Sequence, residues 1–285
     1  MLARMWTLPI ALALAALQPQ SVVPAATNGA GVEPLLSAAG ADAGKVVALI
    51  LGASAELGQL DGDAFHRLAD RLEPYCKRAF FSPEELPGQE RLGVVLHTVQ
   101  SGELPGRIAR RYGIGAGLLG WLNAGYDERK LRAGQTLKLL DLSDKSLQLT
   151  IDRGRCRLAA WRKLPDAGGW VLMAYVPIGV GASETPTPTG RTKVTRRVLD
   201  PQWTHPVTKQ VFAPGDPGNL LGGYWVALDP EGIGKEGIGL HGYTGDTPEI
   251  WLEKQSSNGC LRLLQSDMDR LFHLALEGTE VTITP

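Results

Sequence analysis

The chain has 285 residues, 44% of them hydrophobic, which supplies enough apolar material for one or two packed domains and excludes a disordered chain. Its 29 Lys and Arg nearly balance its 30 Asp and Glu, so the net charge is -1. A nucleic-acid partner usually requires a basic face, and this balance argues against one. The 35 Gly and 19 Pro, together with only 6% aromatic residues, indicate many turns and short strands.

The N-terminus carries a segment that is apolar enough for an export signal. Arg4 precedes an apolar run over residues 5–17, and small residues follow at 23–26. This order is typical of a secretory signal peptide, and the run is shorter than the roughly 20 residues of a membrane span. We expect residues 1–26 to be a signal peptide or, as the alternative, an uncleaved anchor that would make a membrane a partner. Residues 27–44, rich in Ala, Gly and Ser, predict a linker.

Residues 45–90 are predicted to be helical. A first helical pattern covers 45–57 and a second covers 61–72. The apolar face of the second is formed by Phe65, Leu68, Ala69 and Leu72. We therefore expect a helical hairpin, which Pro74 and then SPEE at 82–85 close before Pro87. Nothing in this region carries chemistry, so His66 and Cys76 are expected to be packing residues.

Residues 97–141 form a unit of different character. A strand-like start is followed by two helical pieces and a closing strand, and this βααβ order predicts a small two-layer module. The unit resembles a LysM domain. The resemblance rests on four blocks, namely VQSGE at 99–103, IARRYG at 108–113, LL at 118–119 with LN at 122–123, and LRAGQTL at 131–137. It implies binding to N-acetylglucosamine-containing glycan, chiefly peptidoglycan, through the loops before the first helix and after the second.

From Ser146 to Pro285 the pattern is that of a β-rich domain. Apolar and polar residues alternate over 147–151 and 156–160, and a longer apolar run covers 170–180. Cys156 is expected on the apolar side of its strand. The fold class is therefore multi-domain and mixed: a helical N-terminal hairpin, a small βααβ module, and a mainly-β, β-sandwich-like domain over 146–285.

The three cysteines, Cys76, Cys156 and Cys260, cannot all pair among themselves. At least one thiol therefore stays unpaired or bonds elsewhere, and whether Cys76 pairs with Cys156 remains open. None of the three lies near a His or another Cys at the spacing of a zinc site, so no metal is expected.

The segment that points to chemistry is GLHG at 239–242, followed by SSNGCLR at 256–262. A thiol attacks a carbonyl as its thiolate, so Cys260 requires a neighbouring base, and His241 is the natural choice. Gly259 lets the backbone turn so that the thiol projects, while the amides around Cys260 can point at the oxygen that becomes negative. These residues predict acyl transfer by a Cys-His pair.

The whole region 146–285 resembles the catalytic domain of L,D-transpeptidases of the YkuD type. The resemblance rests on TPTG at 187–190, PQW at 201–203 with Pro206, NLLG at 219–222, HG at 241–242, SNGCLR at 257–262 and GT at 278–279. It implies that Cys260 is the nucleophile and His241 the base, with the imidazole oriented by the Gly242 carbonyl. It also implies an oxyanion hole formed by the amides of Gly259 and Cys260, and no metal or organic cofactor.

The resemblance further implies a substrate-binding set of Ser257, Asn258 and Arg262. Ser257 would hold the loop, and Arg262 would either bind a substrate carboxylate or fix the loop through an ion pair. Asn258 stands where the family most often has His, and Tyr243 stands where a smaller hydroxyl residue is frequent. The other candidate bases, His205 and His273, and the strand residue His97, are expected to be non-catalytic.

The function implied is that of an exported bacterial enzyme of the periplasm or cell envelope, contributing to cell-wall biogenesis and cell shape. Cys260 would attack a peptidoglycan tetrapeptide stem, release D-Ala and pass the thioester to an amine of a neighbouring stem. Its partners are peptidoglycan glycan strands and stem peptides. Two alternatives stay open: an L,D-carboxypeptidase that uses the same Cys-His pair, and a non-catalytic peptidoglycan-binding protein.

Overall fold

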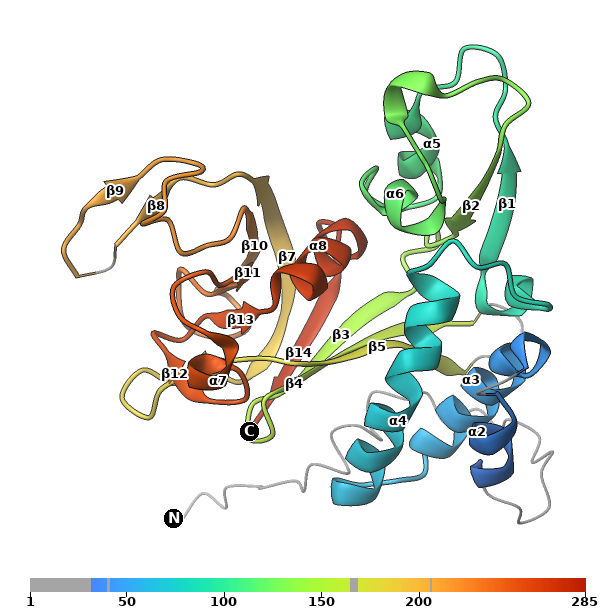
Figure 1. Cartoon of the computed structure of the whole chain (residues 1–285). Helices are drawn as coiled ribbons and strands as arrows, with labels where there is room; N and C mark the ends of the chain where they lie inside the picture. Colours follow the sequence, from blue (N-terminus) through green and yellow to red (C-terminus); the bar gives the residue numbers. More distant parts are fainter. Residues whose placement is uncertain (1–31, 40–41, 165–168, 206) are drawn as a thin grey trace.

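The computed structural model describes residues 32–39, 42–164, 169–205 and 207–285, so the predicted signal peptide at 1–26 lies outside the described residues. Three bodies follow one another along the chain: N-terminal helices, a βααβ module and a large sheet (Figure 1). Within the described ranges, no helix combines the length and the apolarity needed to cross a membrane.

The N-terminal body contains helices α2 (Glu33–Ala39), α3 (Ala43–Leu57) and α4 (Gly62–Phe80), followed by the 3₁₀ turn η1 (Gln89–Leu92). The expected linker at 27–44 is thus wrong over α2, because Ala and Leu favour a helix there and the buried Leu36 packs it onto the other helices. Helix α4 also extends beyond the predicted pattern at 61–72 and continues through Pro74 to Phe80. Burial of Cys76 and Phe80 holds the last turns of α4 against the rest of the protein, which outweighs the missing N–H of proline.

The βααβ module consists of β1 (Val94–Thr98), α5 (Pro105–Arg111), α6 (Leu118–Leu122), the 3₁₀ turn η2 (Glu128–Lys130) and β2 (Thr136–Leu140). The two strands pair antiparallel, with Val94 opposite Leu140 and Thr98 opposite Thr136. Pro105 stands in the first turn of α5, where its missing N–H costs no helical hydrogen bond. The element order is the one predicted from the sequence.

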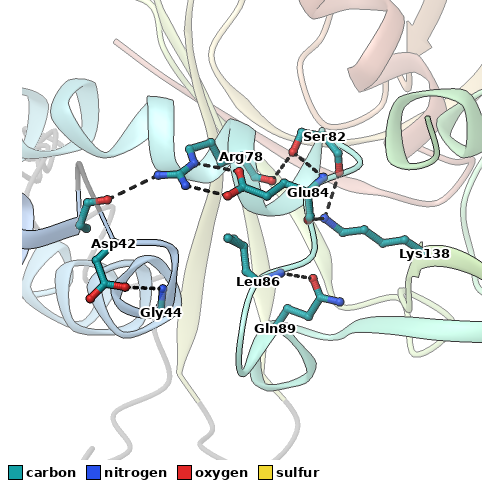
Figure 2. A network of polar contacts seen from close by, with 9 residues as sticks. Asp42, Gly44, Arg78, Ser82, Glu84, Leu86, Gln89 and Lys138 are labelled. Carbon is teal, nitrogen blue, oxygen red and sulfur yellow. Dashed lines mark hydrogen bonds and ion pairs between the residues drawn. The ribbon is translucent and has the colours of Figure 1, made fainter. Parts of the chain in front are cut away.

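A buried lysine ties this module to the end of α4 (Figure 2). Lys138 of β2, only 3% exposed, donates to the carbonyl oxygens of Ser82, at 2.9 Å, and of Glu84. Its burial lowers the pKa of its ammonium to about 8. The Glu84 side chain in turn accepts two hydrogen bonds from Arg78 of α4, at 2.9 and 2.7 Å. The segment after α4 is therefore held from both sides.

The remaining strands form an eight-stranded sheet with the order β13-β11-β10-β7-β14-β3-β4-β5. Their bounds are β3 (Leu147–Asp152), β4 (Arg157–Lys163), β5 (Trp170–Pro177), β7 (Gly190–Leu199), β10 (Tyr224–Leu228), β11 (Gly239–Gly242), β13 (Leu261–Leu263) and β14 (Glu280–Thr284). Four short strands make two further pairs, β6 (Val180–Gly181) with β12 (Gln255–Ser257) and β8 (Trp203–Thr204) with β9 (Val211–Phe212).

Strand β7 joins the two halves of the large sheet. Residues 190–193 pair with β14, while residues 194–199 pair with β10. The domain is therefore mainly β, but as one continuous curled sheet rather than the two facing sheets of the expected sandwich-like arrangement. Helix α8 (Gln265–Leu274) packs on β10 and β11, and the short α7 (Pro248–Trp251) lies beside β12.

The N-terminal helices cover the outer edge of β5. The Leu172 amide donates to Ser54 Oγ at 3.1 Å and the Tyr175 amide donates to Glu73 Oε2 at 2.5 Å, so α3 and α4 satisfy backbone groups of the edge strand. Cys76 is buried in this interface, where its thiol donates to the Leu172 carbonyl at 3.2 Å. Cys156 is buried too, but it lies in the turn before β4 with a φ of 54°, not on a strand as expected.

The βααβ module is fixed against the sheet by side chains rather than tethered loosely. Arg162 of β4, 4% exposed, donates to the carbonyls of Leu92, at 2.5 Å, and Asp141, at 2.7 Å, which flank the module. On the other side Trp121 Nε1 of α6 donates to Asp269 Oδ2 of α8 at 2.9 Å. The module therefore holds one orientation relative to the sheet.

Candidate active site

Cys260 and His241 lie on neighbouring strands at one end of the sheet. Strand β11 runs parallel to β13, with His241 opposite Arg262, and Cys260 immediately precedes β13. Both side chains line one cleft of about 580 Å³. Ser257, Asn258 and Arg262 line the same cleft, whose aromatic walls are Trp203, Trp225 and Tyr243. Five of the seven predicted site residues are thus brought together around one cavity, and Gly242 and Gly259 adjoin it.

His241 is held as a neutral imidazole with a defined tautomer. Its ring is 6% exposed, and Nδ1 contacts the Gly242 carbonyl oxygen at 2.5 Å. Because a carbonyl can only accept, Nδ1 carries the proton and Nε2 is left as the acceptor. Burial lowers the pKa of His241 to about 4, and the Trp225 ring stacks on it with centroids 5.9 Å apart. A neutral imidazole of this tautomer can take a proton from a thiol.

The Cys260 thiol is also neutral in the resting protein. Burial raises the pKa of the thiol, while a backbone hydrogen bond and the charges of Arg262 and Lys235 act in the opposite direction. Its sulfur donates to the Gly237 carbonyl at 3.4 Å. All three cysteines of the chain are free. The pair therefore starts as a neutral thiol and a neutral imidazole.

The loop before Cys260 is closed by Ser257. Its hydroxyl donates to the Cys260 carbonyl at 2.6 Å and accepts from the Gly259 amide at 3.1 Å. The Gly259 amide is therefore bonded within the loop in this structure, and the Cys260 amide is the other donor of the predicted oxyanion hole. Gly259 has a φ of 110°, which an L side chain rarely adopts.

Arg262 extends over an aromatic ring at the edge of the cleft. Its guanidinium carbon stands 3.9 Å from the centre of the Tyr243 ring, and the Tyr243 hydroxyl donates to Asp246 Oδ2 at 2.9 Å. Across the described residues no carboxylate forms an ion pair with Arg262. Of its two expected roles, the ion pair that fixes the loop is not formed. Asn258 is exposed at the cleft.

Comparison with known proteins matches two parts of the chain to family models. Residues 147–283 match the family model of the YkuD L,D-transpeptidase catalytic domain, and residues 97–139 match that of the LysM domain. The chain carries a YkuD-type L,D-transpeptidase catalytic domain and a LysM domain. The N-terminal helices lie outside both matched ranges.

Curated relatives and solved structures that resemble parts of the chain are named as L,D-transpeptidases. The putative L,D-transpeptidases YqjB and YkuD of Bacillus subtilis are each 31% identical, over 38% and 39% of this chain and 57% and 54% of their own lengths. The chain thus spans little more than half the length of these relatives. The catalytic domain of an E. faecium L,D-transpeptidase is 22% identical over 48% of this chain and 96% of its own, with a TM-score of 0.32. L,D-transpeptidase 3 of Mycobacterium tuberculosis is 15% identical over 49% and 61%, with a TM-score of 0.36.

Two threonines of the transpeptidase domain hold the loop before Cys260 (residues 257–260), and the sequence analysis assigned them no function. Thr187, fully buried, donates to the Gly259 carbonyl and accepts from the Gly181 amide, both at 2.9 Å. Thr185 donates to the Ser257 carbonyl at 3.0 Å. The alternation of Thr and Pro at 185–188 is the signal that could have found them, because buried threonine hydroxyls between prolines must bond outside their own segment.

The connection from β10 to β11 forms another wall that the sequence reasoning missed. It carries the Gly237 carbonyl that accepts from the thiol, and Lys235, whose charge acts on Cys260. Glycines at 232, 234 and 237, directly before the HG pair of the transpeptidase domain, are the sequence signal. They let this backbone approach the neighbouring strand and loop closely.

The remaining histidines take no part in lining the cleft. His205 Nδ1 accepts from the amides of Val207 and Thr208, and His273 stands beside the LysM domain at the end of α8. His97 contacts Glu103 at 2.7 Å within the LysM domain, and His66 contacts Tyr175 between α4 and β5. Over the described part of the chain, no group of three or more His, Cys, Asp or Glu is arranged to hold a metal ion.

Proposed function

We propose that this protein is an exported L,D-transpeptidase that cross-links bacterial peptidoglycan in the periplasm or cell envelope. The observation that carries the proposal is that Cys260 and His241 line one cleft, with His241 Nδ1 on the Gly242 carbonyl so that Nε2 is the proton acceptor. Membership of both matched families supports peptidoglycan as the partner.

The proposed reaction begins with proton transfer. His241 Nε2 takes the thiol proton as Cys260 Sγ attacks the carbonyl carbon of the residue before the terminal D-Ala of a tetrapeptide stem. The amide of Cys260 donates to the oxygen that becomes negative. The C–N bond then breaks, the imidazolium gives its proton to the leaving amine, and D-Ala departs from a thioester on Cys260.

The second half transfers the acyl group. An amine of a neighbouring stem loses a proton to His241 and attacks the thioester carbon. The C–S bond breaks, a new amide forms, and the proton returns to the Cys260 sulfur. If water replaces the amine, the same residues give an L,D-carboxypeptidase. Arg262, which lines the cleft without an ion-pair partner in the described chain, is suited to bind a carboxylate of the stem.

Mass spectrometry of the purified chain with a tetrapeptide stem tests the proposal. We expect an acyl adduct on the Cys260 peptide and release of D-Ala, both abolished in Cys260→Ala and strongly reduced in His241→Asn. His97→Asn, in the LysM domain, is the matched histidine control and should retain both signals. An acceptor stem should convert the adduct into a cross-linked dimer, whereas a hydrolysed product alone would identify the carboxypeptidase. A folded sample that gives neither adduct nor D-Ala would leave only a peptidoglycan-binding protein.

A further inference from the structure

The connection between β10 and β11, residues 229–238, lies directly against the nucleophile loop. The Gly237 carbonyl accepts the hydrogen bond of the Cys260 thiol at 3.4 Å. A Cβ placed on Gly259 would stand 3.0 Å from Ile238 Cδ1 and 3.0 Å from Lys235 Nζ. The backbone and side chains of this connection therefore pack behind the loop that carries the sulfur.

Lys235 is the cationic side chain of this connection. It is half-buried, and its ammonium lies near the Gly259 backbone, one residue from Cys260. Among the described residues, no Asp or Glu forms an ion pair with it. It is also not one of the residues that line the cleft. Its charge is thus uncompensated by a paired carboxylate and is directed at the loop rather than at the space a stem would occupy.

The site needs such a charge because other features favour the neutral thiol. Burial is the largest influence on the thiol and raises its pKa, although a backbone hydrogen bond at Gly239 acts in the opposite direction. A carbonyl acceptor such as that of Gly237 bonds only the protonated form. His241, whose pKa is about 4, is a weak base. A nearby positive charge lowers the energy of the thiolate and so offsets these effects.

We propose that Lys235 is a positioning residue of the reaction. The β10–β11 connection holds its ammonium against the loop that carries Cys260. The ammonium stabilises the negative charge on the Cys260 sulfur while the thiol proton resides on His241. The inference rests on the proposed function in that Cys260 is the nucleophile. Of the two cations whose charges favour the thiolate, Arg262 lines the cleft, where a carboxylate can also reach it, whereas Lys235 lies against the Gly259 backbone and does not line the cleft.

Alkylation of the native protein by iodoacetamide tests this without any stem substrate. The rate at Cys260 is followed across pH by mass spectrometry of its peptide, which distinguishes it from the buried Cys76 and Cys156. Removal of one unit charge in Lys235→Gln should slow alkylation at pH 7 by roughly threefold to tenfold and move the midpoint of the pH profile upward. Lys235→Arg, which keeps the charge, should stay near the parent rate. Lys77→Gln, on an exposed position of α4, is the matched control and should leave the profile unchanged.

The dependence of the alkylation rate on salt concentration distinguishes a charge effect of Lys235 from a packing effect. Because the ammonium is partly exposed, raising the salt concentration to about 1 M should slow the parent protein towards the rate of Lys235→Gln and affect that variant less. An unchanged profile in Lys235→Gln, or equal losses in the Gln and Arg variants, would overturn the inference. Failure of the proposed function would look different: the parent would show the charge-dependent alkylation profile but form no adduct with a stem.

Discussion

The hydroxyl of Thr187 offers the sharpest test of how the nucleophile loop is held. It bonds the Gly259 carbonyl and the Gly181 amide, and the residue is 0% exposed. In Thr187→Val the shape is kept, but both backbone groups lose their partner inside the protein. Leaving a buried polar group unsatisfied costs about 1 to 3 kcal/mol, so the pair should cost about 2 to 5 kcal/mol. That is a large part of a typical stability of about 5 to 15 kcal/mol.

Thr187→Ser is the matched control, because it keeps the hydroxyl and loses one methyl group, worth about 1 kcal/mol. Urea unfolding monitored by circular dichroism gives the free energy of unfolding, and stem acylation gives kcat/KM. About 1.4 kcal/mol corresponds to a factor of ten in rate. We expect at least that much of the cost to displace the loop in the folded protein, so kcat/KM of Thr187→Val should be at least tenfold below that of Thr187→Ser. Equal stability and equal kcat/KM in the two variants would refute the reasoning.

Three further predictions concern protonation, domain docking and substrate binding. The pKa of His241 is about 4 in the folded protein, against an ordinary value of 6.5. Between these two pH values the imidazole binds a proton in the unfolded chain but not in the folded one, so the free energy of unfolding falls as the pH drops from 6.5 to 4. The fall should reach about 3 kcal/mol in urea titrations and be shallower in His241→Asn; parallel curves would contradict it. Arg162→Met removes two charge-assisted hydrogen bonds that flank the LysM domain and should lower the stability measured by thermal unfolding by about 2 to 4 kcal/mol. It should also speed proteolysis near residue 141, whereas Arg107→Met, at an exposed position, should have neither effect. Arg262→Lys should raise KM for a stem with a terminal carboxylate more than for its amide, because lysine does not reproduce the planar fork; equal rises would exclude carboxylate binding there.

The sequence was most informative where local chemistry is strict. A cysteine that follows a glycine, and a histidine that precedes one, predict a Cys-His acyl-transfer pair, and the structure places both side chains on one cleft. The order of elements in the LysM domain followed from periodicity, because each helix buries one face. The curled sheet was not predictable in this way. Its continuity depends on β7 changing partners near Val194, and no pattern within β7 records that change.

The hydrogen bond of the Gly259 amide was not predicted, for a different reason. An amide beside a nucleophile can donate its hydrogen bond to the substrate or to a nearer acceptor. Here the Gly259 amide donates to the Ser257 hydroxyl, two residues earlier. Serine hydroxyls commonly bond an amide two residues on, so this local competition could have been read from the spacing. The Thr-Pro alternation and the glycines at 232, 234 and 237 mark the segments of Thr187 and Lys235, but their partners could not be read from the sequence. Each side chain contacts or lies near a loop dozens of residues away, a relation that only the folded chain defines.

The docking of the LysM domain changes what that domain can contribute to catalysis. A flexible tether would raise the local concentration of stems without selecting among them. Here Arg162 and Trp121 hold the domain on the sheet from two sides, and the loops that join β1 to α5 and α6 to β2 lie at its far end (Figure 1). If those loops bind the glycan as proposed, the bound sugar stands at a set separation from Cys260. The geometry of the glycan strand then decides which stem reaches the cleft. Removing the hydrogen bonds of Arg162 should therefore alter which stems react as well as how fast they react.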